Sequence, residues 1–262
     1  MNQDKVKEAL GKIRVAKADY TLLFSGKQSI KVNGLYKPFQ REIIIHNRNF
    51  TDDNMLMYTA IHEYAHHIHS TELGKDPSGR AHTVEYWALF HELLSQAEAA
   101  DVYRNIFDCP ELAPITGQIK DYLEEDGDVM RAIGVRLNIA SDGCRKIHAR
   151  FEDYIDRVIR MNRTTAHVCM KAAILKVDTS LGFDGMKLLA GITKEDTRDM
   201  AAAALDLGKT QAEVKALRKT PAAETDEITR MEKERARIER TIETLQRKRD
   251  DLTAALDQKK SA

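Results

Sequence analysis

The residues of this chain best suited to do chemistry are two histidines with a glutamate between them, in the order His62, Glu63, Tyr64, Ala65, His66. On a helix, side chains four residues apart lie one turn apart on the same face, so both imidazoles can bind one metal ion. Glu63 then stands beside the metal, where a carboxylate can take a proton from a water molecule. We therefore predict a zinc ion (Zn²⁺) bound by His62 and His66, with Glu63 as the catalytic general base.

A catalytic zinc ion keeps three protein ligands and one open position, so a third ligand must come from elsewhere in the chain. We favour His82, because Thr83 after it can cap the next helix and direct His82 toward the metal. Glu98, further along that helix, is the second candidate. Glu85 and His69 complete the set of alternatives.

The helix that carries the motif is predicted to begin at a cap within residues 51–53 and to run to about His69. A second helix is predicted from about Thr83 to about Ile106. Between them, residues 74–80 include proline and glycine and read as a loop. These two helices would present the candidate ligands to each other.

Strand signals occur only before the motif. Residues 20–24, 29–32 and 41–46 are short apolar runs, and Asn33-Gly34 is typical of a tight hairpin turn. We therefore predict a small N-terminal antiparallel β element. The run at 42–46 is expected to be an edge strand beside the site, where an extended peptide could add as a further strand.

The chain from about 116 to 218 is predicted to be helical. Within it, residues 151–159 and 166–173 flank a short turn, a spacing compatible with a helix-turn-helix in which Arg160, Arg163 and Lys171 would contact phosphates. The other interpretation is a helical scaffold that supports the first domain. Nucleic-acid binding is only weakly supported, because 41 Lys and Arg residues balance 41 Asp and Glu residues.

The segment after Pro221 has no glycine, proline or aromatic residue, and its apolar residues recur at alternating spacings of three and four. This pattern is typical of a coiled coil, so we predict self-association or pairing with a partner helix through residues 222–260. A single solvated helix folded against its own domain is the alternative.

Residues 1–10 contain no apolar stretch of the kind found in a secretory signal, and no run approaches the ~20 apolar residues of a membrane span. The cysteines, Cys109, Cys144 and Cys169, are odd in number and far apart, which favours reduced thiols over disulfides. We therefore expect a cytoplasmic protein with no membrane contact.

The motif at residues 62–66, followed by His82-Thr-Val-Glu-Tyr-Trp87, resembles the SprT-type and YgjP-like zincin metallopeptidases over residues from about 40 to 105. The resemblance implies His62, His66 and His82 as zinc ligands and Glu63 as the base. Glu98-Ala-Ala-Asp101 after the motif is similar to the ImmA/IrrE-like peptidases, which would imply Glu98 as the ligand and a regulator acting on repressors.

Together these features predict a mainly α (α+β) protein. It has a zincin-like metallopeptidase domain at 1–110, a helical region at 111–220 and a coiled-coil tail at 221–262. The expected function is zinc-dependent hydrolysis of peptide bonds in a protein or peptide substrate. The alternative is a DNA- or protein-binding regulator whose zinc site is structural or inactive, with the helical region and the coiled coil making the contacts.

Overall fold

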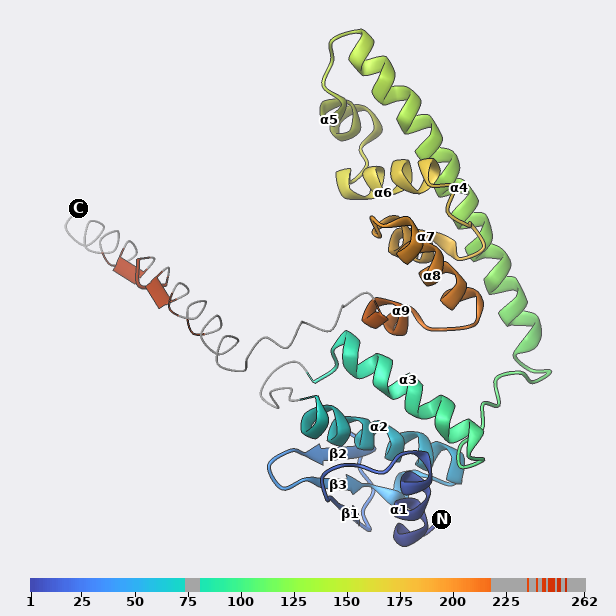
Figure 1. Ribbon diagram of the computed structural model, residues 1–262, viewed down its shortest axis with the longest axis vertical. Helices are drawn as coiled ribbons and strands as arrows, with labels where there is room; N and C mark the ends of the chain where they lie inside the picture. The colour runs from blue at the N-terminus through green and yellow to red at the C-terminus, as the bar shows by residue number, and fades with distance from the viewer. Residues whose placement is uncertain are drawn as a thin grey trace. The chain divides into compact units, whose positions relative to one another are not determined.

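The computed structural model describes residues 1–73 and 81–217, together with a few separate positions between 235 and 253. The described chain is mainly helical, with one small sheet near the N-terminus (Figure 1). Two compact units are distinguished, Met1–Arg218 and Lys219–Ala262. The predicted coiled coil falls almost wholly outside the described residues.

The described part of the first unit contains three short strands near its N-terminus and is otherwise helical. Its elements are α1 (Gln3–Ile13), β1 (Thr21–Phe24), β2 (Gly34–Lys37), β3 (Glu42–Ile45), a 3₁₀ turn η1 (Asn47–Asn49), α2 (Asp53–Glu72), α3 (Val84–Ala99), α4 (Ala113–Lys146), α5 (Phe151–Asp153), a π-helical turn η2 (Tyr154–Ile159), α6 (Arg163–Ile174), α7 (Gly182–Ala190), α8 (Glu195–Asp206) and α9 (Gln211–Leu217).

The sheet has the order β1-β3-β2, and it is mixed. β1 pairs with β3 in parallel, whereas β2 pairs with β3 antiparallel. The predicted all-antiparallel element is therefore wrong, and β3 is the central strand where we expected an edge strand. The reason is that β2 does not pair with β1. The two strands leave a gap between them, and β3, which follows later in the chain, pairs with both.

The predicted strand at 29–32 is also wrong. The backbone of Ser29 forms its hydrogen bonds with a side chain and not with a neighbouring strand. The Asn49 amide donates to the Ser29 carbonyl at 2.7 Å and accepts from the Ser29 N–H at 2.8 Å. Ile30 is 99% exposed, so the apolar run buries little. Asn33-Gly34 is consequently no hairpin turn, since Gly34 is the first residue of β2.

Helix α2 begins where its cap predicts: the Asp52 carboxylate accepts from the N–H groups of Asn54 and Met55. Helix α3 begins after Thr83, whose hydroxyl accepts from the Tyr86 N–H. Both predicted starts are confirmed. α3 ends at Ala99, earlier than predicted, because Asp101 adopts a left-handed conformation with φ of 53°.

The main core joins α1, β1, β3, α2 and α3, and α2 lies between the sheet and α3 (Figure 1). One face of α2 supplies Leu56, Met57, Ala60, Ile61, Tyr64, Ala65 and Ile68 to this core. Burial of this apolar face stabilises the helix that carries the motif. The motif therefore stands on a packed element.

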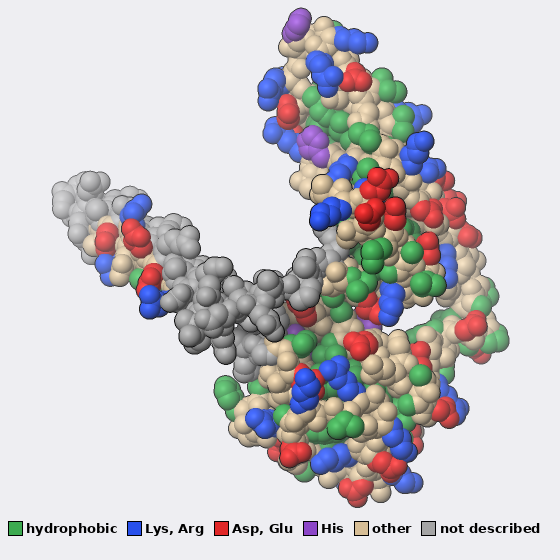
Figure 2. Space-filling view, in the orientation of Figure 1, with side chains coloured by type: hydrophobic (Ala, Val, Ile, Leu, Met, Phe, Trp, Pro, Cys, Tyr) green, Lys and Arg blue, Asp and Glu red, His purple; other side chains and the backbone are tan. Residues whose placement is uncertain are grey.

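Two further clusters of buried apolar side chains lie within α4 to α9. The helix predicted at 151–159 is instead the short α5 followed by the π-helical η2, which ends at Arg160 in a left-handed conformation with φ of 58°. Helix α6 begins after Asn162, which caps the Thr165 N–H. Figure 2 shows Lys and Arg side chains next to Asp and Glu side chains over α4, α5 and α6.

None of the helices in the described part of the chain is both long enough and apolar enough to pass through a membrane.

Candidate metal centre

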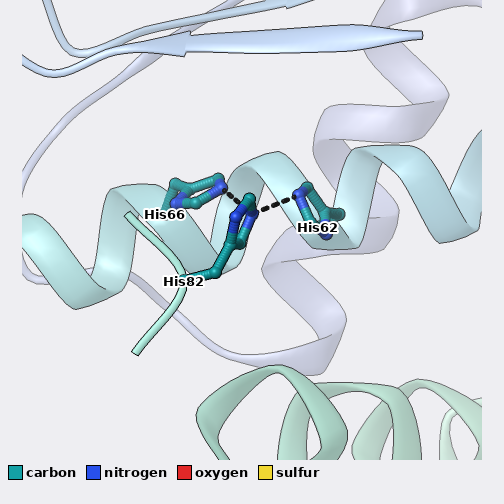
Figure 3. Close-up of side chains that lie close together, drawn as sticks. All are labelled: His62, His66 and His82. Atoms are coloured by element: carbon teal, nitrogen blue, oxygen red, sulfur yellow. Dashed lines mark hydrogen bonds between the residues drawn. The ribbon is translucent and has the colours of Figure 1, made fainter. Parts of the chain in front are cut away.

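Three histidine side chains converge on one point. His62 and His66 project from α2, and His82 reaches them from the residues just before α3 (Figure 3). His82 Nε2 lies 3.2 Å from His62 Nε2 and 3.2 Å from His66 Nε2. All three ligand atoms lie within 4.8 Å of one another. Among the residues that the structure describes, this is the one such group of three potential metal ligands.

The two nitrogen separations that involve His82 suit a single ion. Two nitrogens that each lie ~2.0–2.1 Å from a tetrahedral zinc ion are about 3.3 Å apart. Hydrogen bonding alone satisfies this arrangement poorly, because His82 Nε2 carries either one proton or one lone pair and faces two nitrogens. A cation that accepts three lone pairs resolves that conflict.

The surroundings favour the neutral forms of His62 and His66. Burial, followed by the nearby His82, lowers the pKa of His62 to about 4. Burial, followed by the neighbouring histidines, lowers the pKa of His66 to about 3. Neutral imidazole is the form that binds a metal, so both side chains are competent ligands at neutral pH.

Aromatic rings pack against all three histidines. The ring of Tyr86 stacks on His66 at a centroid distance of 4.3 Å, and its hydroxyl donates to the His62 carbonyl at 3.1 Å. Trp87 stacks on His82 at 5.3 Å. The Tyr86-Trp87 pair at the start of α3 thus contacts all three histidines.

Glu63 is 6% exposed and lies under β2. A Cβ placed on Gly34 would stand 2.8 Å from Glu63 Cγ and 2.9 Å from its Oε1, so only glycine allows this approach. Burial raises the pKa of Glu63 to about 7, and a backbone hydrogen bond from Tyr36 opposes the rise. A carboxyl group with this pKa exchanges protons readily near neutral pH.

The other candidate ligands lie elsewhere. Glu98 is exposed on α3 and does not belong to the group of three. Glu85 and His69 do not belong to it either. His69 is buried, and its Nε2 lies 3.4 Å from the Thr83 hydroxyl, next to the cap that positions His82.

Two further histidines have structural contacts. His67 is fully buried; its Nε2 donates to the Ala18 carbonyl at 2.9 Å, so its Nδ1 accepts from the Tyr36 hydroxyl at 3.1 Å. This bond connects β2 to α2 one residue after His66. His91 lies one turn beyond Trp87 and contacts the Thr210 hydroxyl at 2.9 Å, next to α9.

Sequence reasoning missed Gly34 and Trp87. The Asn33-Gly34 pair predicts a turn, but an isolated glycine in a strand can also indicate that another group approaches the backbone closely. Trp87 belongs to the sequence pattern His82-Thr-Val-Glu-Tyr-Trp87, but that pattern does not predict its stacking on His82. The stacking depends on the path of the chain between α2 and α3.

The hydroxyl groups of two buried tyrosines near the three histidines have backbone partners. The Tyr64 hydroxyl donates to the Arg14 carbonyl at 2.6 Å, and the Tyr86 hydroxyl donates to the His62 carbonyl. Tyr103 is buried beside Tyr58.

Comparisons of the chain with protein-family models, with curated proteins and with solved structures gave no match. The site itself therefore has to carry the functional argument.

Proposed function

We propose that this protein is a zinc-dependent metallopeptidase in which His62, His66 and His82 bind the metal and Glu63 is the general base. The observation that carries the proposal is the convergence of three imidazole nitrogens, with separations of 3.2 Å about His82. Three nitrogen ligands with space for a fourth suit catalytic zinc. The site resembles that of the zincin metallopeptidases.

A zinc ion held there would supply Lewis acidity, which polarises a carbonyl group and makes water acidic near neutral pH. Glu63 would take the proton from the attacking water and deliver it to the leaving amine. Its raised pKa, caused first by burial, favours this exchange. The close approach of Gly34 prevents the carboxylate from swinging away toward β2.

The exposed edge of β2 is evidence in favour of a peptide substrate. The His46 N–H donates to the Asn33 carbonyl, so alternate residues of β2 face β3, and the backbone groups of Gly34 and the Tyr36 carbonyl are directed to the free edge. The Tyr36 N–H on that side bonds to Glu63. An extended peptide could pair with that edge and cross the site. We thus assign to β2 the role first expected of residues 42–46.

The test compares the wild-type protein with Glu63→Gln and with Glu98→Gln, a matched removal of an exposed carboxylate. Metal content is measured after purification and dialysis, and cleavage is measured with a library of quenched fluorescent peptides. We expect one zinc ion per chain in all three proteins and loss of cleavage, by about 100-fold or more, only in Glu63→Gln.

Three outcomes would contradict the proposal or its ligand set. If the wild-type protein does not bind stoichiometric zinc, the proposed metal site is wrong. Zinc-loaded wild-type protein without cleavage supports the regulator with a structural zinc site instead. Loss of zinc in Glu98→Gln would shift the ligand set toward the ImmA/IrrE-like arrangement.

A further inference from the structure

A cavity of about 390 Å³ lies beside the first two turns of α2. It is lined chiefly by Met55, Tyr58, Thr59, Ile106 and Phe107, and Asn33 also lines it. We propose that this cavity is a specificity pocket that receives a large apolar side chain, such as leucine, methionine or phenylalanine, from the peptide substrate. This inference rests on the proposed peptidase function and names the substrate class.

The cavity and the metal site occupy one face of one helix. Thr59 precedes Glu63 by four residues and Tyr58 precedes His62 by four, so each lies one helical turn before its partner. Gly34 contacts both regions, because a Cβ there would stand 2.9 Å from Glu63 Oε1 and 3.0 Å from Thr59 Cγ2. The cavity therefore begins directly beside the general base.

The free edge of β2 leads to the same place. Asn33, which lines the cavity, immediately precedes Gly34 at the start of β2. A peptide paired with this edge would pass Glu63 and reach the cavity within one or two residues, since a strand advances ~3.3 Å per residue. Side chains of a strand alternate between faces, so one residue near the cleaved bond would point into the cavity.

The chemistry of the lining selects apolar groups. None of the residues that line the cavity carries a charge. Met55, Ile106 and Phe107 are 62%, 62% and 63% exposed, so a ligand side chain there would remove apolar surface from water on both partners. The Thr59 hydroxyl already donates to the Met55 carbonyl. A charged ligand side chain would lose hydration without finding a partner.

The far wall is held in place before any substrate arrives. The Asn54 side chain pairs with the backbone of Arg104 in both directions, donating to its carbonyl at 3.0 Å and accepting from its N–H at 2.8 Å. This pair fixes the segment after α3 against the start of α2. Ile106 and Phe107, which follow directly, are therefore presented beside Met55. A preformed pocket costs less ordering on binding.

The test measures binding, so that it does not depend on turnover. Zinc-loaded full-length Glu63→Gln protein is titrated into fluorescein-labelled octapeptides of Gly, Ala and Ser with one varied position, Phe, Leu, Ala or Asp. Anisotropy gives each Kd. We expect the Phe and Leu peptides to bind about tenfold or more tightly than the Ala peptide, and the Asp peptide to bind most weakly.

Second-site variants locate the effect. Phe107→Asp and Met55→Asp, each made in the Glu63→Gln protein, should abolish the preference for Phe and Leu while zinc content stays the same. Phe39→Asp is the matched control, because Phe39 is 88% exposed in the turn after the other end of β2. That variant should keep the preference. Circular dichroism confirms that each variant is folded.

Equal Kd values for the Phe, Leu and Ala peptides would overturn the pocket, as would no detectable binding of any peptide or tighter binding of the Asp peptide. A preference that survives both cavity variants would overturn it too. Failure of the proposed function looks different, since it is absence of cleavage or of zinc in the wild-type protein.

Discussion

The indole of Trp87 stacks on the imidazole of His82, with ring centroids 5.3 Å apart and planes inclined by 25°. His82 is exposed and lies outside the helices, so this contact holds a side chain that its own backbone leaves free to turn. Trp87 also lies 6.1 Å from the ring of His91, which contacts Thr210. The third candidate ligand is thereby linked to the packing of α3 against α9.

Trp87→Ala should weaken zinc binding, because His82 would lose the ring that restricts its rotamers. Aromatic pairs contribute about 0.5–1.5 kcal/mol beyond their area, so the zinc Kd should rise about three- to tenfold. Competition with a chromophoric chelator measures this Kd. Trp87→Phe keeps an aromatic ring and should stay close to wild type. An unchanged Kd in Trp87→Ala would show that the stacking does not position His82.

Gly34→Ala should destabilise the protein and disturb Glu63. The new Cβ would stand within 3.0 Å of Glu63 and Thr59, so β2 or the carboxylate must move. Overpacking of this kind costs about 1–3 kcal/mol, to be measured by urea unfolding. Peptide cleavage should fall with it, while zinc binding persists.

The control for that substitution is Gly11→Ala in α1, where nothing lies within 4 Å of the added Cβ. Alanine there should stabilise the helix by about 0.5–1 kcal/mol. A Gly34→Ala protein as stable and active as wild type would mean that β2 shifts freely over Glu63.

Glu72→Ala should destabilise the first unit. Glu72 is 3% exposed at the end of α2; its Oε2 lies 2.7 Å from Arg14 Nη2, and its Oε1 accepts from the Lys17 N–H at 3.2 Å. Its removal leaves both donors without their partner, at a cost of about 1–3 kcal/mol in urea unfolding. Glu8→Ala, which breaks an exposed pair with Lys12 on α1, should stay near wild type. Equal effects of the two changes would contradict this distinction.

The attachment of α9 should weaken in acid. Burial alone would raise the pKa of Glu213, but hydrogen bonds from Lys209 and Thr210 outweigh it and lower that pKa below 4.5. Because the folded pKa lies below the unfolded one, the carboxylate stabilises the fold above about pH 4.5, and this contribution is lost as the pH falls through the folded pKa.

Glu213→Gln should therefore reduce the loss of stability as the pH falls below about 4.5, as followed by urea unfolding at each pH. Glu111→Gln removes one exposed carboxylate from the connection between α3 and α4 and serves as the matched control. If both variants lose stability with acid as steeply as wild type, the Thr210–Glu213 cap does not contribute.

The sequence by itself determined the features that depend on local energetics. The cap at Asp52 and the four-residue spacing of His62 and His66 are properties of one helix, and Thr83 caps the next helix directly after His82. Caps and helical periodicity act within one or two turns, so they can be read without a partner. The two helices and the pairing of His62 with His66 on one face followed from them.

Only the tertiary structure decided which distant groups meet. Residues 29–32 have strand propensity, but Ser29 forms its backbone hydrogen bonds with the Asn49 side chain. β3 lies between β1 and β2 in the sheet. Gly34 came to lie against Glu63, His82 and not Glu98 reached the histidine pair, and Ile106 and Phe107 came to line a cavity with Thr59. Each of these depends on burial and pairing between segments far apart in the chain, which local propensity does not encode.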